Sequence, residues 1–128
     1  MRLSLLAILL SAAAISPALA QDAAAGQRAF IVCRSCHQIG PGAKNAVGPV
    51  LNGIVGRKSG SIPDFPYSEA NRDSGLTWDE PTLERYLAHP QQVVPGTKMT
   101  FPGFPDPQKI KDVIAFLSRY EADGETKP

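Results

Sequence analysis

The sequence predicts an all-α, single-domain fold in which three main helices are joined by long loops. Ile110, Val113, Ile114 and Leu117 follow the i, i+3, i+4, i+7 spacing of an amphipathic helix. Glycine and proline recur every few residues between the predicted helices. No run alternates apolar and polar residues as a half-buried strand does. The pattern therefore favours helices over a β-sheet.

The first twenty residues predict a cleaved signal peptide. Arg2 supplies a positive charge, an apolar run covers residues 3–15, and ALA at 18–20 forms an A-x-A cleavage site. A membrane anchor is the alternative, but this apolar run is shorter than the roughly 20 residues that span a bilayer. We therefore expect residues 21–128 to be one soluble domain, exported to the periplasm without a transmembrane segment.

Charge in the expected mature chain is balanced. Arg2 is the only charged residue of the leader, so the 13 Lys and Arg of the full chain become 12, against 12 Asp and Glu. Such a chain lacks the basic excess that is typical of nucleic-acid binding. We expect no nucleic-acid partner and a monomeric protein.

A first helix is expected over residues 23–32, with Phe30 and Ile31 on its inner side. It runs directly into Cys33. Residues 39–65 should form a long loop, because Gly, Pro, Asn and Ser recur throughout them.

A second helix is expected to begin near Thr77. This residue can be the N-cap, with Glu80 at the capping-box spacing, although Pro81 could shift the start by a residue or two. The helix carries apolar residues on one face and should stop before Pro90.

A proline-rich loop over residues 89–107 precedes the third helix. It contains five prolines in nineteen residues, which is too many for long regular structure. Asp106 is a favourable N-cap and Pro107 suits the first helical position. The polar tail after Tyr120 is expected to fray.

The segment CRSCH, residues 33–37, contains both cysteines of the chain and one of its two histidines. The spacing C-x-x-C-H is the signature of c-type haem attachment. Two thiols three positions apart can each form a thioether with a vinyl group of the porphyrin, and the next imidazole can ligate the iron. The motif predicts one haem c, attached covalently through Cys33 and Cys36.

Three other interpretations of this motif are weaker. A disulfide between Cys33 and Cys36 would close a very small loop and stabilise the fold little. A redox-active dithiol needs a thioredoxin-like βαβ setting, which this sequence does not predict. Zinc needs four ligands in a tetrahedron, and the direct link between Cys36 and His37 strains that geometry.

Met99 and His89 are the two candidates for a second axial ligand. They are the methionine and the histidine that remain once Met1 and His37 are set aside. Met99 lies in a loop made flexible by Gly96, although gap filling in the core is its other possible role. His89 stands at a helix end, where a solvated imidazole is the simpler interpretation.

Three more motifs follow CRSCH in order. They are GPVLNGIVGRKSG at 48–60, FPYSEANRDSGLTW at 65–78 and PGTKMTFPG at 95–103. Together the four motifs strongly resemble class I cytochromes c, in particular bacterial cytochromes c2 and mitochondrial cytochrome c. The resemblance covers essentially the whole mature chain. It implies the class I fold, wrapped around one covalent haem.

The resemblance also implies a role for each matching residue. His37 and Met99 match the axial ligands, and Pro49 matches the proline whose carbonyl orients the histidine ring. The remaining matches are Cys33 and Cys36 at the thioethers; Arg57, Tyr67 and Trp78 at a haem propionate; Asn71, Tyr86 and Thr97 beside the methionine; and Leu51, Leu83, Leu87, Phe101 and Leu117 in the apolar wall.

The function that the resemblance implies is a soluble one-electron carrier, not an enzyme. Its expected partners are a cytochrome bc1-type donor and, as acceptor, a photosynthetic reaction centre or a terminal oxidase of respiration. A peroxidase-like haem enzyme or a ligand sensor is the alternative, and it would require a weak or absent Met99 bond.

One departure from the mitochondrial pattern concerns charge around the haem edge. The lysine-rich rim is replaced by HPQQ at 89–92 and FPDP at 104–107, which leaves chiefly Lys44, Arg57, Lys58, Arg72 and Lys98. Fewer charge pairs would then steer docking, so we expect docking to depend less on salt.

Overall fold

The computed structural model describes residues 21–128, and the expected signal peptide lies outside them. The described chain forms the helices α1 (Ala23–Ala29), α2 (Glu69–Asp73), α3 (Glu80–Ala88), α4 (Pro90–Val93) and α5 (Pro107–Leu117), with a 3-10 turn, η1, at Phe30–Val32. Its β-structure is limited to isolated bridges. The all-α fold is therefore confirmed. No helix in this range has both the length and the hydropathy needed to cross a bilayer.

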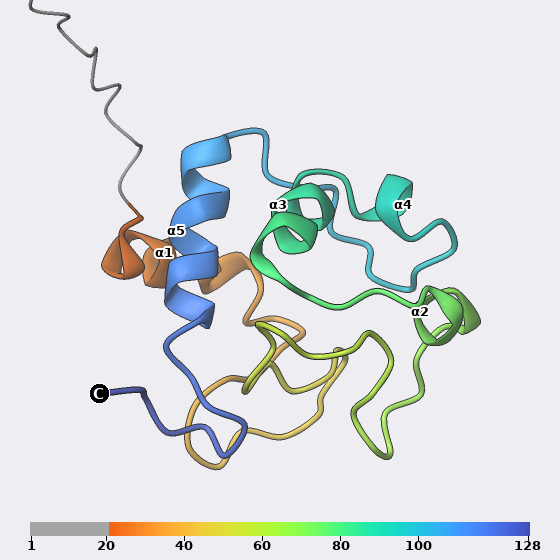
Figure 1. The fold of residues 1–128 in the computed structure, drawn as a ribbon, viewed down its shortest axis with the longest axis horizontal. Helices are drawn as coiled ribbons and strands as arrows, with labels where there is room; N and C mark the ends of the chain where they lie inside the picture. Colours follow the sequence, from red (N-terminus) through yellow and green to blue (C-terminus); the bar gives the residue numbers. More distant parts are fainter. Residues whose placement is uncertain (1–20) are drawn as a thin grey trace, which may run out of the picture.

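Helices α1 and α5 form the most extensive helix contact of the fold (Figure 1). Gly26 permits their close approach, because a Cβ atom at this position would overlap the backbone carbonyl of Asp112. The rings of Phe30 and Phe116 pack beside this crossing, with their centroids 5.2 Å apart. Ile31 does not share the inner side with Phe30. It is 69 % exposed, since successive helical residues point in different directions and Phe30 takes the core position.

Helix α3 starts two residues later than the capping box at Thr77 predicts. Its N-cap is Asp79, whose carboxylate accepts a hydrogen bond of 2.9 Å from the Thr82 N–H. Pro81 then falls within the first turn, where a missing N–H costs nothing. Thr77 instead pairs with Lys58 in an isolated bridge. The expected apolar face is buried and α3 ends before Pro90, as predicted.

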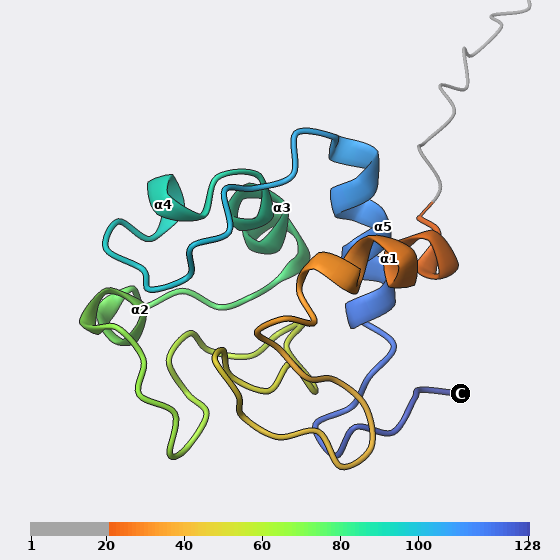
Figure 2. The ribbon, with the colours of Figure 1, turned by 180° about the vertical axis from the view of Figure 1, so that it is seen from behind.

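Helices α2 and α4 lie in segments for which the sequence suggests no helix (Figure 2). Ser68 caps α2 by accepting a hydrogen bond of 3.1 Å from the Asn71 N–H. Helix α4 begins at Pro90, which is almost completely buried. Both helices are too short to display an apolar period. The N-cap of α5 at Asp106 is as predicted.

The C-terminal tail folds back onto the domain, so the expectation that it frays is wrong. Its backbone is held by hydrogen bonds from Glu121 N–H to Glu125 oxygen (2.8 Å) and from Lys127 N–H to Arg119 oxygen (2.7 Å). Gly124 is buried against the Gly40 carbonyl. Figure 1 shows this tail beside the long loop that follows α1. Backbone pairing, which leaves no apolar signal in the sequence, orders it.

Candidate haem site

A cavity of about 630 Å³ lies between the CRSCH segment, the long loop, α3, α5 and the loop that carries Met99. The four leucines expected in the apolar wall all line it. So does every residue that the resemblance assigns to the cofactor or the iron: Cys33, Cys36, His37, Pro49, Arg57, Tyr67, Asn71, Trp78, Tyr86, Thr97, Met99 and Phe101. The fold thus brings these residues together from distant parts of the chain.

Cys33 and Cys36 follow η1 on a further helical turn. The N–H groups of Cys36 and His37 both donate to the Cys33 carbonyl, at 3.1 and 2.9 Å. This turn places the two thiols on adjacent positions of one cavity wall. Both cysteines are free and partly buried. Burial, followed by the neighbouring Cys36, raises the pKa of Cys33 to about 11. Before haem attachment, its sulfur is therefore a protonated thiol at neutral pH.

The His37 ring is fixed by the loop opposite. Its Nδ1 lies 2.8 Å from the Pro49 carbonyl oxygen. Because a carbonyl can only accept, Nδ1 carries the proton and Nε2 keeps a lone pair for a metal. Burial lowers the pKa of His37; the Pro49 bond opposes this, and the Arg57 cation adds to it. The imidazole is thus held neutral, as a metal ligand must be.

Met99 is surrounded by a connected polar network. The Tyr86 hydroxyl lies 3.8 Å from the Met99 sulfur and 3.4 Å from Thr97 Oγ1. Thr97 Oγ1 in turn donates to Asn71 Oδ1 at 2.9 Å. Burial raises the pKa of Tyr86, so this hydroxyl keeps its proton and can donate to sulfur. The network matches the three polar residues that the resemblance places beside the methionine.

Two members of this network were not predicted. Ser68 Oγ donates to Asn71 Oδ1 at 2.8 Å, and Gln91 Nε2 donates to the Met99 carbonyl at 2.8 Å. A serine before a helix gives a capping signal that could have located Ser68. Gln91 gives none, because an isolated glutamine in a segment that the sequence predicts as a loop has no characteristic spacing.

Arg57, Tyr67 and Trp78 lie in another part of the cavity wall. Arg57 Nη1 donates to the carbonyls of Val50 (2.9 Å) and Asn52 (3.2 Å), whereas its Nε is buried without a hydrogen-bond partner among the described residues. Burial lowers the pKa of Arg57. Tyr67 accepts a hydrogen bond of 3.2 Å from the Ile62 N–H.

The composition of the cavity fits haem c. Its wall is largely apolar, two free thiols stand three positions apart, and an imidazole and a thioether are both present. The buried Arg57 Nε lacks a partner. An unpaired buried donor is costly, and a carboxylate of a bound cofactor would satisfy it.

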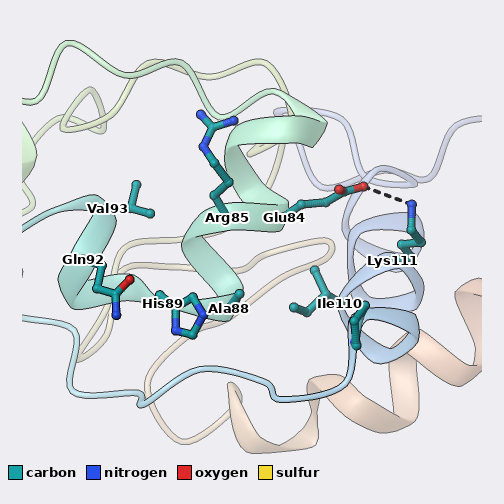
Figure 3. A pocket seen from close by; sticks show the side chains of 9 residues that line it. Glu84, Arg85, Ala88, His89, Gln92, Val93, Ile110 and Lys111 are labelled. Carbon is teal, nitrogen blue, oxygen red and sulfur yellow. Dashed lines mark hydrogen bonds and ion pairs between the residues drawn. The ribbon is translucent and has the colours of Figure 1, made fainter.

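His89 belongs to a different part of the molecule. It lines a groove of about 540 Å³ between α3, α4 and α5, beside Ala88 (Figure 3). At this groove the Lys111–Glu84 ion pair of 3.4 Å joins α5 to α3. His89 is absent from the residues that line the larger cavity. Within residues 21–128, no three His, Cys, Asp or Glu side chains are grouped to hold a metal ion. The geometry thus places His89 away from the larger cavity.

The comparison with protein families agrees with this site. The family model described as "Cytochrome c" matches residues 23–120 of the chain. The chain belongs to the cytochrome c family. The match spans all the helices and the complete cavity lining, so the fold expected from the four motifs is the observed one.

Curated cytochromes resemble this family member over nearly its whole length. Cytochrome c2 from Blastochloris viridis is 50 % identical over 127 residues, which cover 99 % of this chain and 100 % of that protein. Cytochrome c2 from Rhodoblastus acidophilus is 55 % identical over 105 residues, covering 82 % and 98 %. The solved structure of cytochrome cH from Methylobacterium extorquens has a TM-score of 0.71 and 49 % identity, covering 76 % of this chain and 97 % of that one.

As a cytochrome c, the protein carries covalently bound haem c and transfers electrons. It is an electron carrier and not an enzyme. The cavity described above is the site whose residues suit that cofactor.

Proposed function

We propose that this cytochrome carries one electron at a time with His37 and Met99 as the two axial ligands of its haem iron. The observation that carries this proposal is that both side chains line the same cavity, although they lie far apart in the sequence. A neutral imidazole and a soft thioether are the ligand pair that raises the reduction potential of a c-type haem.

The other predicted residues have distinct tasks in this proposal. Cys33 and Cys36 would attach the haem by thioether bonds. Arg57, with Tyr67 and Trp78, would neutralise or hydrogen-bond a propionate. The apolar wall, to which Phe101 contributes, would exclude water from the cofactor.

When bound, haem c supplies an iron centre that can reversibly lose and regain one electron. The chain would hold both iron ligands in place, so that neither bond to the iron needs to break during electron transfer. Pro49 fixes the tautomer and direction of His37 through the 2.8 Å contact. Tyr86 holds the Met99 sulfur by its hydroxyl at 3.8 Å. Because Pro49 and Tyr86 each hold one ligand in place, both ligands would stay on the iron and keep small molecules from it.

The cellular setting is part of the same proposal. We infer that residues 1–20 are removed on export, that the mature chain from Gln21 is a soluble periplasmic monomer, and that it docks transiently with membrane redox complexes. A bc1-type donor and a reaction centre or terminal oxidase as acceptor suit the similarity to proteins named cytochrome c2. N-terminal sequencing of the exported holoprotein and its reduction by a purified bc1 complex with quinol would test these inferences.

The optical spectrum tests the ligand assignment. We expect ferric holoprotein, exported from a strain that attaches haem c, to show the weak red band of methionine sulfur ligation. Met99→Ala should abolish that band while the covalent haem remains, whereas His89→Ala should retain it. If the parent protein contains haem but lacks the band, or if ferrous parent binds carbon monoxide readily at neutral pH, Met99 is not a stable ligand.

A further inference from the structure

Each polar group of Met99 has a partner in a different place. Its N–H donates to Thr97 Oγ1 at 3.3 Å, and its sulfur lies 3.8 Å from the Tyr86 hydroxyl. These two contacts come from inside the domain. Its carbonyl oxygen faces the other way and accepts the 2.8 Å hydrogen bond from Gln91 Nε2.

Gln91 reaches this carbonyl from helix α4, which is held in place by buried residues on both sides of Gln91. Helix α4 is anchored on both sides of it by Pro90, which is almost completely buried, and by Val94, which is buried too. The Gln91 side chain is exposed, and its Nε2 also lies 3.5 Å from the Thr97 carbonyl, at the limit of a hydrogen bond. One amide thus spans the outer side of the loop that holds the methionine.

The contact affects ligation if it forms only while the loop holds Met99 in its observed position. If the backbone around Met99 moves away when the sulfur leaves the iron, the Gln91 bond to its carbonyl is lost to water. An interaction made only while Met99 is bound to the iron shifts the equilibrium between bound and released Met99 toward the bound state by its own net free energy. A single hydrogen bond contributes modestly but measurably.

We propose that Gln91 is a positioning residue that keeps Met99 on the iron by holding the outer side of its loop. This inference rests on the proposed His37 and Met99 ligation. It assigns a specific task to a residue outside the cavity lining, at a position where the chain departs from the lysine-rich rim of mitochondrial cytochrome c.

Displacement of Met99 by added imidazole tests this proposal. Ferric holoprotein at neutral pH is titrated with imidazole, and loss of the red methionine band gives the dissociation constant. Gln91→Ala removes the side chain, and Gln91→Glu keeps its shape but removes the donor. We expect both variants to bind imidazole roughly two- to tenfold more tightly than the parent, the range that corresponds to one net hydrogen bond.

Gln92 provides the matched control. It is exposed on the same helix, and its side chain makes no hydrogen bond within residues 21–128. Gln92→Ala and Gln92→Glu should therefore leave the dissociation constant within a factor of two of the parent. Equal behaviour of the Gln91 and Gln92 variants would overturn the proposal. So would a change in Gln91→Glu alone, since this would reveal an effect of charge.

The unliganded spectra separate this result from failure of the proposed function. A parent protein without the red band would refute methionine ligation itself, and the role of Gln91 with it. A parent with the band, but with unchanged imidazole affinity in both Gln91 variants, would refute only the role of Gln91. The reduced spectrum and thermal midpoint of each variant identify any loss of folding.

Discussion

Gly48 determines where the His37 ring can lie. A Cβ atom built on Gly48 would come within 2.7 Å of His37 Nδ1 and 2.8 Å of Nε2, closer than such atoms approach in real proteins. The Gly48 N–H also donates to the Cys36 carbonyl at 2.7 Å. The glycine therefore brings the loop backbone directly against the imidazole. Its neighbour Pro49 is then in reach of Nδ1.

We expect Gly48→Ala to displace the His37 ring and weaken its hydrogen bond to Pro49. Overpacking of this kind costs about 1–3 kcal/mol, which a denaturant titration of the ferric holoprotein would measure. The reduction potential should shift as well, because the hydrogen bond from His37 to the Pro49 carbonyl tunes this ligand and would be disturbed. Ala46→Ser changes an exposed neighbour and should alter neither quantity. An unchanged stability and potential in Gly48→Ala would mean that the loop yields without affecting the ligand.

The residues of the site differ in how far the sequence could locate them. His37 and the cysteines are given by one compact motif, and Met99 is the methionine left beside a flexible Gly96 once Met1 is set aside. Gln91 escapes such reasoning. Its role depends on which carbonyl a short helix happens to face, and that is fixed only by tertiary packing.

At the scale of elements, the crossing of α1 and α5 depends on Gly26. In an exposed helix, replacing Gly by Ala stabilises by up to about 1 kcal/mol. Here the added methyl would overlap the Asp112 carbonyl and approach Phe116 Cβ to 2.9 Å. We expect the clash to dominate, so that Gly26→Ala lowers the free energy of unfolding by about 1–3 kcal/mol. Thermal or denaturant unfolding would measure it.

The matched control for this helix is Ala24→Gly. Ala24 is exposed on α1, and its replacement should cost roughly 0.5–1 kcal/mol through helix propensity alone. The two substitutions exchange the same two residue types in opposite directions. If Gly26→Ala stabilises the protein instead, the helices can separate at little cost and their contact is not closely packed.

The helices that the sequence predicts well are those with a full apolar period. Helix α5 extends over eleven residues, long enough for its buried face to repeat. Helices α2 and α4 have five and four residues, and local caps and a buried Pro90 fix them. The tail after Tyr120 escaped prediction for a related reason: its order comes from backbone hydrogen bonds and a buried Gly124, not from apolar side chains.

At the scale of the whole molecule, the cavity lining includes exposed apolar residues and few exposed cations. Val32 and Val47 both line the cavity and are 52 % and 77 % exposed. Arg57, expected among the cations of this face, is instead partly buried and bonded to backbone carbonyls. Lys98 is the exposed cation among the described lining residues. Electrostatic steering around the cavity should therefore be weak.

Adding one positive charge beside the cavity should strengthen the electrostatic steering of an anionic reaction partner. We expect Val47→Lys to be oxidised faster by hexacyanoferrate(III), by roughly two- to tenfold at low salt, because a trivalent anion about 10 Å from one new cation gains on the order of 1 kcal/mol in water. The gain should largely vanish at high ionic strength, where the charges are screened. Stopped-flow rates over a range of salt concentrations would measure both effects.

Two further variants separate local charge from net charge and from loss of the valine. Ala24→Lys adds the same charge outside the cavity lining, and Val47→Ala removes the apolar side chain without adding charge. Steering requires that the charge lie where the electron leaves, so only Val47→Lys should show the full gain at low salt. If Ala24→Lys accelerates the reaction equally, the net charge of the protein governs the encounter. The lack of cations around the cavity would then have no part in the weak salt dependence expected of the parent.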